Sequence, residues 1–134
     1  MAKLPRGIRN NNPLNIRKSG IAWQGKVTAG TDPDFEQFTH LKYGLRAAIV
    51  NIRTYIRRDH LDTIRQIVTR WAPPSENNTE AYVNKVSELS GIAVSQRIVY
   101  NDKSSILRIV RAMAQVECGQ SLEYFLCEQA WSLI

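Results

Sequence analysis

The most regular hydrophobic pattern in this chain lies between Ser104 and Gly119. Apolar residues recur there at steps of three and four, which is the period of a helix with one buried face. These residues are Ile106, Ile109, Val110, Met113 and Val116. Asp102 can cap the start of this helix, and Gly119 can end it in a left-handed conformation. At about 100° per residue, Glu117 returns to within roughly 20° of the direction of Ile106, so the pattern predicts a carboxylate inside the apolar stripe.

The same spacing predicts further helices, and a different pattern precedes them. The helices are expected to run from Tyr43 to Ile56, from a cap at Asp62 to Trp71, from a capping box at Asn77 and Glu80 to Gly91, and from a cap at Ser121 to Leu133. Residues 21–38 instead carry short apolar runs separated by turn-forming residues, which are typical of β-strands. We expect a small β element there, with Trp23, Phe35 and Phe38 on its packed side. The patterns predict a mainly α (α+β) fold.

The composition fits one globular domain covering residues 1–134. Of the 134 residues, 43% are hydrophobic and 22% are charged, which allows a core without metal or disulfide staples. No apolar run approaches the roughly 18 residues of a membrane span, and the first residues lack the apolar core of a signal peptide. Cys118 and Cys127 lack zinc-type spacing, and His40 and His60 lie far from them in sequence. We therefore expect structural or free thiols, no metal and no cofactor.

The formal net charge is +6, and the basic residues are spread over several segments. This excess fits an anionic polymer as partner, either nucleic acid or cell-envelope material, and it also occurs simply as a source of solubility. The sequence has no helix-turn-helix signature, no aromatic motif of the RNA-binding kind and no zinc spacing. Nucleic acid is therefore the weaker alternative.

Glu117 is the first candidate for chemistry. Partial desolvation and the negative end of the helix dipole both raise the pKa of a carboxyl group, so that it can stay protonated near neutral pH and act as a general acid. The plain alternative is a glutamate that reaches water or pairs with Arg111. Asp32, Asp34 and Glu36 offer a second carboxylate, although charges of this kind are by default surface charges of a turn.

Asn10, Asn11 and Asn12 precede Pro13, where a helix or a central strand is disfavoured. Their amides offer donors and acceptors for the hydroxyl and amide groups of a sugar. They can equally satisfy their own loop through Asx-turns.

Several segments in combination resemble a family of phage and prophage proteins, whose members are often labelled only as virion structural proteins. The similar segments are 9–17 (RNNNPLNIR, against "NNPxNIR"), 23–25, 35–38, 43–47, 71–83 (WAPPSENNTEAYV, against "WAP…ENxT…YV") and 114–119 (AQVECG, against the "ExG" helix end). The resemblance covers roughly residues 6–120.

The order of elements also resembles that of bacterial glucosaminidases and lytic transglycosylases of the lysozyme superfamily, with one displacement. In those enzymes a helix that ends in the catalytic glutamate comes first, and an Asn-rich loop and a β element follow it. Here the corresponding helix lies near the C-terminus. That order looks like a circular permutation, which is feasible where termini lie close together. The resemblance implies a single lysozyme-like helical domain with a small β-hairpin.

The resemblance further implies cleavage of the β-1,4 glycan bond of peptidoglycan, by a muramidase (lysozyme) or a lytic transglycosylase, with Glu117 as general acid. A second group that steadies the oxocarbenium-like centre or positions water would come from Asp32, Asp34, Glu36 or Tyr82. The residues implied to bind substrate are Asn11, Asn12, Asn15, Trp23, Asn78 and Thr79. The implied partners are peptidoglycan strands and other virion proteins. Without a signal peptide, synthesis in the host cytoplasm and action at the cell wall, in the periplasm or from the virion, are expected.

The alternative is a non-catalytic virion or cell-wall-binding protein that keeps the lysozyme-like shape. Two departures from the family pattern favour it. Leu14 stands where glycine is common, and Cys118 stands between Glu117 and Gly119. Leu14 could alter the turn, because glycine tolerates a positive φ better than any other residue.

Overall fold

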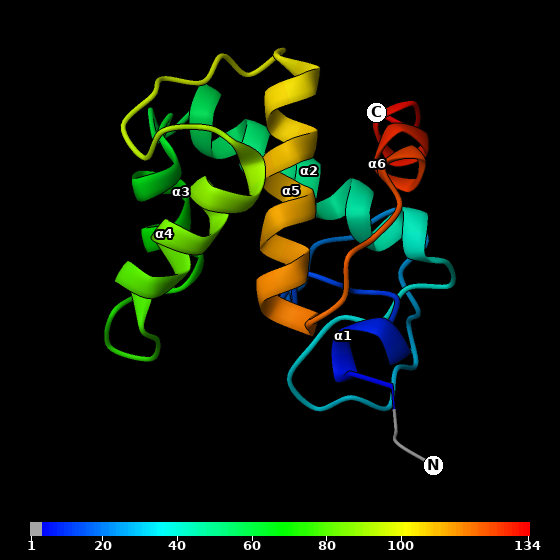
Figure 1. Ribbon diagram of the computed structural model, residues 1–134. Helices are drawn as coiled ribbons and strands as arrows, with labels where there is room; N and C mark the ends of the chain where they lie inside the picture. The colour runs from blue at the N-terminus through cyan, green and yellow to red at the C-terminus, as the bar shows by residue number, and fades with distance from the viewer. Residues whose placement is uncertain (1–3) are drawn as a thin grey trace.

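The computed structural model describes residues 4–134, and this part of the chain forms six α-helices (Figure 1). They are α1 (Arg6–Arg9), α2 (Leu41–Arg57), α3 (Ile64–Trp71), α4 (Thr79–Ser90), α5 (Lys103–Cys118) and α6 (Tyr124–Trp131). The mainly helical class predicted from the sequence is confirmed.

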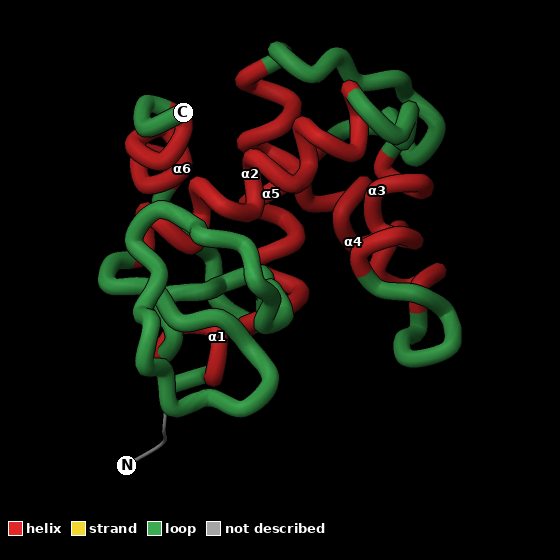
Figure 2. Tube along the Cα trace, turned by 180° about the vertical axis from the view of Figure 1, so that it is seen from behind, coloured by secondary structure: helices red, strands yellow, loops and turns green. Residues whose placement is uncertain are grey.

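Helix α5 lies at the centre of the molecule and packs against α1, α2, α4 and α6. Figure 2 shows the loop-rich N-terminal segment and the α3–α4 pair on opposite sides of α5. The start and the end of α5 are those that the sequence predicts. The Asp102 side chain accepts a hydrogen bond from Ser105 N, and Gly119 takes the left-handed conformation with a φ of 72°. The local signals of this segment were therefore sufficient to define the central helix.

Two helices begin one residue later than the sequence predicts. Helix α3 is capped by the side chain of Thr63 and not by Asp62. Helix α4 is capped by Asn78, so the capping box expected from Asn77 and Glu80 does not form. Asp62 and Asn77 have other partners: Asp62 accepts a hydrogen bond from Arg97 Nε at 3.0 Å, and Asn77 Nδ2 donates to the carbonyl of Pro73 at 3.3 Å.

Helix α6 packs against α2 and completes the molecule. It follows Glu123 without any side-chain cap, so the cap predicted at Ser121 is wrong. Tertiary contacts stabilise this end of the chain instead. Arg46 on α2 donates a hydrogen bond to the carbonyl of Leu133, which follows α6.

The β element predicted within residues 21–38 is reduced, in the part of the chain that the structure describes, to isolated antiparallel bridges. They pair Arg17 with Phe35 and Lys26 with Phe38. Within residues 21–38 the structure shows no regular hairpin. Side chains add to the few backbone hydrogen bonds that hold this segment. The Asn12 amide donates to the carbonyls of Ile16 and Glu36, each at 3.0 Å. Of the three aromatic residues expected on the packed side, Phe38 is buried, while Trp23 and Phe35 are half-buried.

The N-terminal loop lies directly on α2. A Cβ atom at Gly44 would overlap the carbonyl oxygen of Asn11, so only glycine allows this close approach. From the loop, Leu14 and Ile16 enter the hydrophobic core, which continues through α2, α3, α4, α5 and α6. The loop is thus fixed by the core although it has little regular structure.

Cys118 and Cys127 are both buried and carry free thiols. Burial raises the pKa of Cys127 to about 11, so this thiol is neutral and packs as an apolar group. Within residues 4–134, no helix combines the length and the apolar character needed to cross a membrane.

Candidate functional site

Glu117, in the last turn of α5, is held by two side chains from distant parts of the chain. Its Oε1 accepts a hydrogen bond from Asn15 Nδ2 and its Oε2 accepts one from the Tyr82 hydroxyl, each at 3.0 Å. The pairing with Arg111 considered from the sequence does not form, because Arg111 donates to the carbonyl of Leu122. Glu117, Tyr82 and Asn15, all predicted as site residues, therefore meet in one place.

The surroundings of Glu117 raise the pKa of its carboxyl group. Partial burial is the main cause, because loss of water disfavours the charged form. The hydrogen bonds from Asn15 and Tyr82 and the charge of Arg17 act in the opposite direction without cancelling the effect of burial. Burial and the nearby charge of Glu117 also raise the pKa of Tyr82 well above its usual value, so its hydroxyl remains a donor. The site thus holds a glutamate that keeps its proton at a higher pH than an exposed one.

Glu117 lines a cleft with a volume of about 420 Å³, which is in the range of ligand-binding sites. The walls come from the N-terminal loop, from α2 and from the end of α3 with the loop that follows it. The aromatic and cationic side chains of the lining are Phe35, Tyr55, Trp71, Arg17 and Arg70. Flat aromatic surfaces, guanidinium groups and a carboxyl group are together suited to a ligand that has both apolar faces and polar edges.

Glu76 is a second carboxylate of the cleft lining, and it was not predicted from the sequence as a catalytic candidate. It lies on the loop between α3 and α4, where its N–H donates to the carbonyl of Pro73 at 3.0 Å. Glu76 Oε2 is 3.9 Å from Arg17 Nη2, and their side chains are 62% and 69% exposed, so the ion pair is loose. The positive charge of Arg17 also opposes the rise in the pKa of Glu117, so one guanidinium group lies near both carboxylates.

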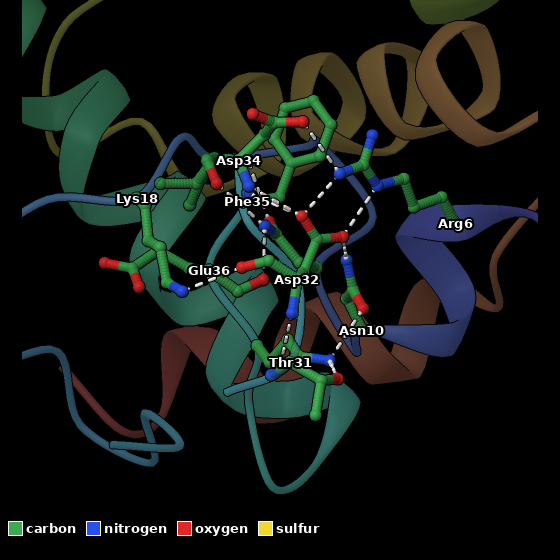
Figure 3. Close-up of polar contacts among 11 residues, drawn as sticks. Arg6, Asn10, Lys18, Thr31, Asp32, Asp34, Phe35 and Glu36 are labelled. Atoms are coloured by element: carbon green, nitrogen blue, oxygen red, sulfur yellow. Dashed lines mark hydrogen bonds and ion pairs between the residues drawn. The ribbon is translucent and has the colours of Figure 1, made fainter. Parts of the chain in front are cut away.

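The structure does not bring Asp32 or Asp34 into the cleft lining. Both carboxylates bind Arg6 in α1, as Figure 3 shows. Arg6 donates to the two oxygens of Asp32 and, at 3.1 Å, to Asp34, and Asn10 adds a hydrogen bond to Asp32 at 2.9 Å. The Arg6 guanidinium holds the pKa of Asp32 well below its usual range. In place of the catalytic role expected of this cluster, the network ties α1 to the loop around Phe35.

Glu36 is likewise outside the cleft lining, because its side chain is buried in the N-terminal loop with an exposed fraction of 1%. Its Oε2 forms an ion pair with Lys26 Nζ at 3.0 Å and accepts a hydrogen bond from Ser19 N at 3.3 Å. The catalytic role expected of Glu36 is thus replaced by a structural one. Within residues 4–134, no group of three or more His, Cys, Asp or Glu side chains could hold a metal ion.

Most residues expected to bind substrate serve the fold instead. Asn11 and Asn12 donate to backbone carbonyls of the N-terminal loop and the segment paired with it. Asn78 caps α4, and the Thr79 hydroxyl donates to the carbonyl at the end of α3 at 2.6 Å. Trp23 packs against the core. None of these five residues belongs to the cleft lining.

The contribution of α2 and α3 to the cleft was not predicted from the sequence. Asn51 and Tyr55, four residues apart on α2, and Arg70 on α3 all line it. Asn51 carried a usable signal, because it is a polar residue between Ile49 and Ile52 in a helix that is otherwise apolar there. Tyr55 carried none, since an aromatic residue on an apolar helix face usually belongs to the core.

Leu14 fits its position without strain. Its side chain is fully buried. The non-glycine residues with positive φ in the described chain are Asn11 at 53°, Asn15 at 54° and His60 at 56°. Asparagine tolerates this conformation better than most residues. The positive-φ positions of this turn are therefore Asn11 and Asn15, and Leu14, which lies between them, is not one of them.

Comparison with known proteins identifies the family of the chain. No family model matches it. Protein P5 of Pseudoalteromonas phage PM2 is 40% identical over 119 residues, which cover 87% of this chain and 72% of the phage protein. The chain belongs to the family of Protein P5. This relationship associates it with bacteriophages. The name Protein P5 describes no reaction, so the chemistry is argued from the site itself.

Proposed function

We propose that this member of the Protein P5 family cleaves the glycan strands of bacterial peptidoglycan, as a muramidase or a lytic transglycosylase, with Glu117 as general acid. The observation that carries the proposal is the Glu117 carboxyl group in the cleft lining, partly buried, with a raised pKa and with two fixed hydrogen-bond donors. Such a group keeps its proton where an ordinary glutamate is charged, and it can give that proton to a leaving oxygen.

In the proposed reaction, Glu117 protonates the glycosidic oxygen while the bond from this oxygen to the anomeric carbon breaks. The donors on Asn15 and Tyr82 then stabilise the carboxylate, because hydrogen bonds to charged acceptors are the stronger ones. In a hydrolase, Glu76 would accept a proton from the water whose oxygen attacks the anomeric carbon. A lytic transglycosylase needs no attacking water and works with a single glutamate, so Glu76 distinguishes the two routes.

The cleft chemistry supports a peptidoglycan substrate. Phe35, Tyr55 and Trp71 offer surfaces for the apolar faces of sugar rings. Arg17 and Arg70 offer guanidinium groups for the carboxylates that peptidoglycan carries on its peptides. The net charge of +6 also favours association with an anionic cell wall.

The arrangement of the ends of α1 and α5 supports the comparison with permuted lysozyme-like enzymes. Helix α1 packs against α5, and a Cβ atom built on Gly7 would lie 3.4 Å from Cys118 Cβ. The Asn-rich loop therefore begins beside the end of the glutamate-bearing helix, although Asn15 and Glu117 are 102 positions apart in sequence. In an enzyme whose glutamate-bearing helix leads directly into the Asn-rich loop, the end of the helix and the start of the loop are adjacent. A circular permutation would cut the chain there and keep the two ends close together.

Membership of a phage family fits two roles for the chain. A wall-cleaving enzyme carried by a virion would reach peptidoglycan together with other virion proteins as partners. A wall-binding virion protein without activity is the alternative, and measurement of cleavage separates the two.

The test is the clearing of purified peptidoglycan by the wild type, by Glu117→Gln and by Glu88→Gln. Glu88 is an exposed residue of α4 outside the cleft lining and serves as the matched control. Loss of a general acid is expected to lower the rate by about 10²- to 10⁴-fold. Circular dichroism of all three proteins shows whether the loss reflects chemistry or unfolding.

The outcomes separate the possible roles. A folded Glu117→Gln protein that clears as fast as the wild type contradicts the proposal. Absence of clearing by the wild type on walls of several types favours the binding role. A slow Glu76→Gln variant with reducing-end products indicates hydrolysis, whereas an unaffected Glu76→Gln variant with anhydro products indicates transglycosylation.

A further inference from the structure

A second hollow adjoins the cleft on the outer side of α3. It has a volume of about 550 Å³ and is lined by Leu61, Arg65, Gln66, Thr69, Arg70 and Pro73. Arg70 and Pro73 also belong to the cleft lining. The two hollows therefore share a rim, and the second one, which we call the α3 groove, continues the cleft across α3.

The α3 groove lies over the polar face of α3. The opposite face, formed by Ile64, Ile67 and Val68, is fully buried in the core. Gln66 and Thr69 are three residues apart, which places them on one side of a helix, and both are exposed. The amphipathic pattern that attaches α3 to the core thus also determines which side of the helix stays open.

The lining of the α3 groove suits a sugar chain better than a polyanion. Leu61 and Pro73 give apolar contacts for the face of a sugar ring. Gln66 Oε1 already accepts hydrogen bonds from Asp62 N and from the Thr63 hydroxyl, so Gln66 offers its NH₂ group to the sugar hydroxyls. The guanidinium group of Arg65 is already paired with both oxygens of Glu80, at 2.7 and 3.2 Å. The charge of Arg65 is therefore partly neutralised, which weakens the groove as a site for a phosphate backbone, because such binding depends on cationic contacts.

We propose that the α3 groove is a second glycan-binding site, occupied by the same peptidoglycan strand after it leaves the cleft. This inference rests on the proposed function, and it adds that the substrate is a polymer that spans both hollows. Each hollow has the volume of a complete small-molecule site, so a ligand that fills both is longer than one that fills either. Arg70, on the shared rim, contacts the strand where it crosses from one hollow to the other.

The test is the dependence of binding on chain length, measured by calorimetry with glycan fragments prepared from peptidoglycan. The disaccharide is compared with an oligomer of several disaccharides, in the Glu117→Gln background so that nothing is cleaved. Thr69→Trp fills the α3 groove from an exposed position, and Asn84→Trp places the same side chain on the exposed face of α4. Without the Trp substitutions, the oligomer is expected to bind more tightly than the disaccharide. Thr69→Trp is expected to reduce this advantage about tenfold, which corresponds to about 1.4 kcal/mol, and Asn84→Trp is expected to leave it unchanged.

Two results overturn the α3 groove as a glycan site. One is equal binding of the disaccharide and the oligomer, and the other is an advantage of the oligomer that Thr69→Trp does not reduce. If Glu117→Gln abolishes clearing while either result is found, the proposed function stands and the groove site is lost. If the wild type clears no peptidoglycan but the length advantage depends on Thr69, cleavage is rejected and the groove remains a binding site.

Discussion

Replacing Glu117 with glutamine is expected to make the protein more stable at neutral pH but not at acid pH. Burial raises the pKa of the Glu117 carboxyl group in the folded state above its value in the unfolded chain. Below the pKa that the group has in the unfolded chain, it is protonated in both states and does not change the free energy of unfolding. As the pH rises through the folded pKa, the unfolded state is favoured because its carboxylate is hydrated, and stability is lost. Glutamine carries no charge and removes this loss.

The contacts of Glu117 set the size of the effect. Glutamine keeps one oxygen for the hydroxyl of Tyr82, whose bond to Glu117 is 3.0 Å long. The new NH₂ group of the glutamine would face the Asn15 amide. The buried Oδ1 of Asn15 has no hydrogen-bond partner within residues 4–134. Rotation of the Asn15 amide by about 180° would turn this oxygen toward the glutamine NH₂ group as an acceptor. Both hydrogen bonds are therefore replaced, in weaker neutral form. We expect a gain of about 1 kcal/mol in the free energy of unfolding at pH 7, because glutamine removes the cost of burying a charged carboxylate.

The assay is urea denaturation followed by circular dichroism, at pH 7 and at a pH below about 4, where glutamate is protonated in the unfolded chain. Glu88→Gln is the control, since an exposed substitution changes stability by no more than about 0.5 kcal/mol. A Glu117→Gln protein less stable than the wild type at pH 7 would refute the argument. An equal gain at both pH values would refute it as well, because the effect would then not come from ionisation.

Three other substitutions test the surroundings of the site. Tyr82→Phe removes a hydrogen bond that lowers the pKa of Glu117. The alkaline limit of the proposed activity is therefore expected to move to higher pH in a profile of kcat/KM against pH. An unmoved limit would exclude Glu117 as the group that sets it. Lys26→Met leaves the buried carboxylate of Glu36 without its ion-pair partner. The free energy of unfolding, measured in urea, is expected to fall by about 3–5 kcal/mol. A loss below about 1 kcal/mol would show that the fold does not need the ion pair. Gly44→Ala forces the N-terminal loop away from α2 and is expected to lower the free energy of unfolding by about 3 kcal/mol, measured by thermal unfolding. Gly20→Ala is the control, because a Cβ atom at Gly20 would contact no other residue.

The helices could be predicted largely from the sequence because their signals are local. Asp102, the apolar period and Gly119 define α5 within one short segment, and the structure agrees at both ends. The placement of Glu117 within the apolar stripe followed from the same period. Where two capping residues stand side by side, as at Asp62 and Thr63, the local signal is ambiguous and the prediction missed by one residue.

The sequence by itself thus determined the helical class, the central helix and the unusual position of Glu117, because a helix repeats its contacts every few residues. Only the tertiary structure decided which groups meet that carboxylate. Asn15 and Tyr82 reach it from distant segments, and Glu76 rather than Glu36 joins it in the cleft lining. The position of a loop side chain depends on long-range contacts such as ion pairs and close backbone approaches, which leave no period in the sequence.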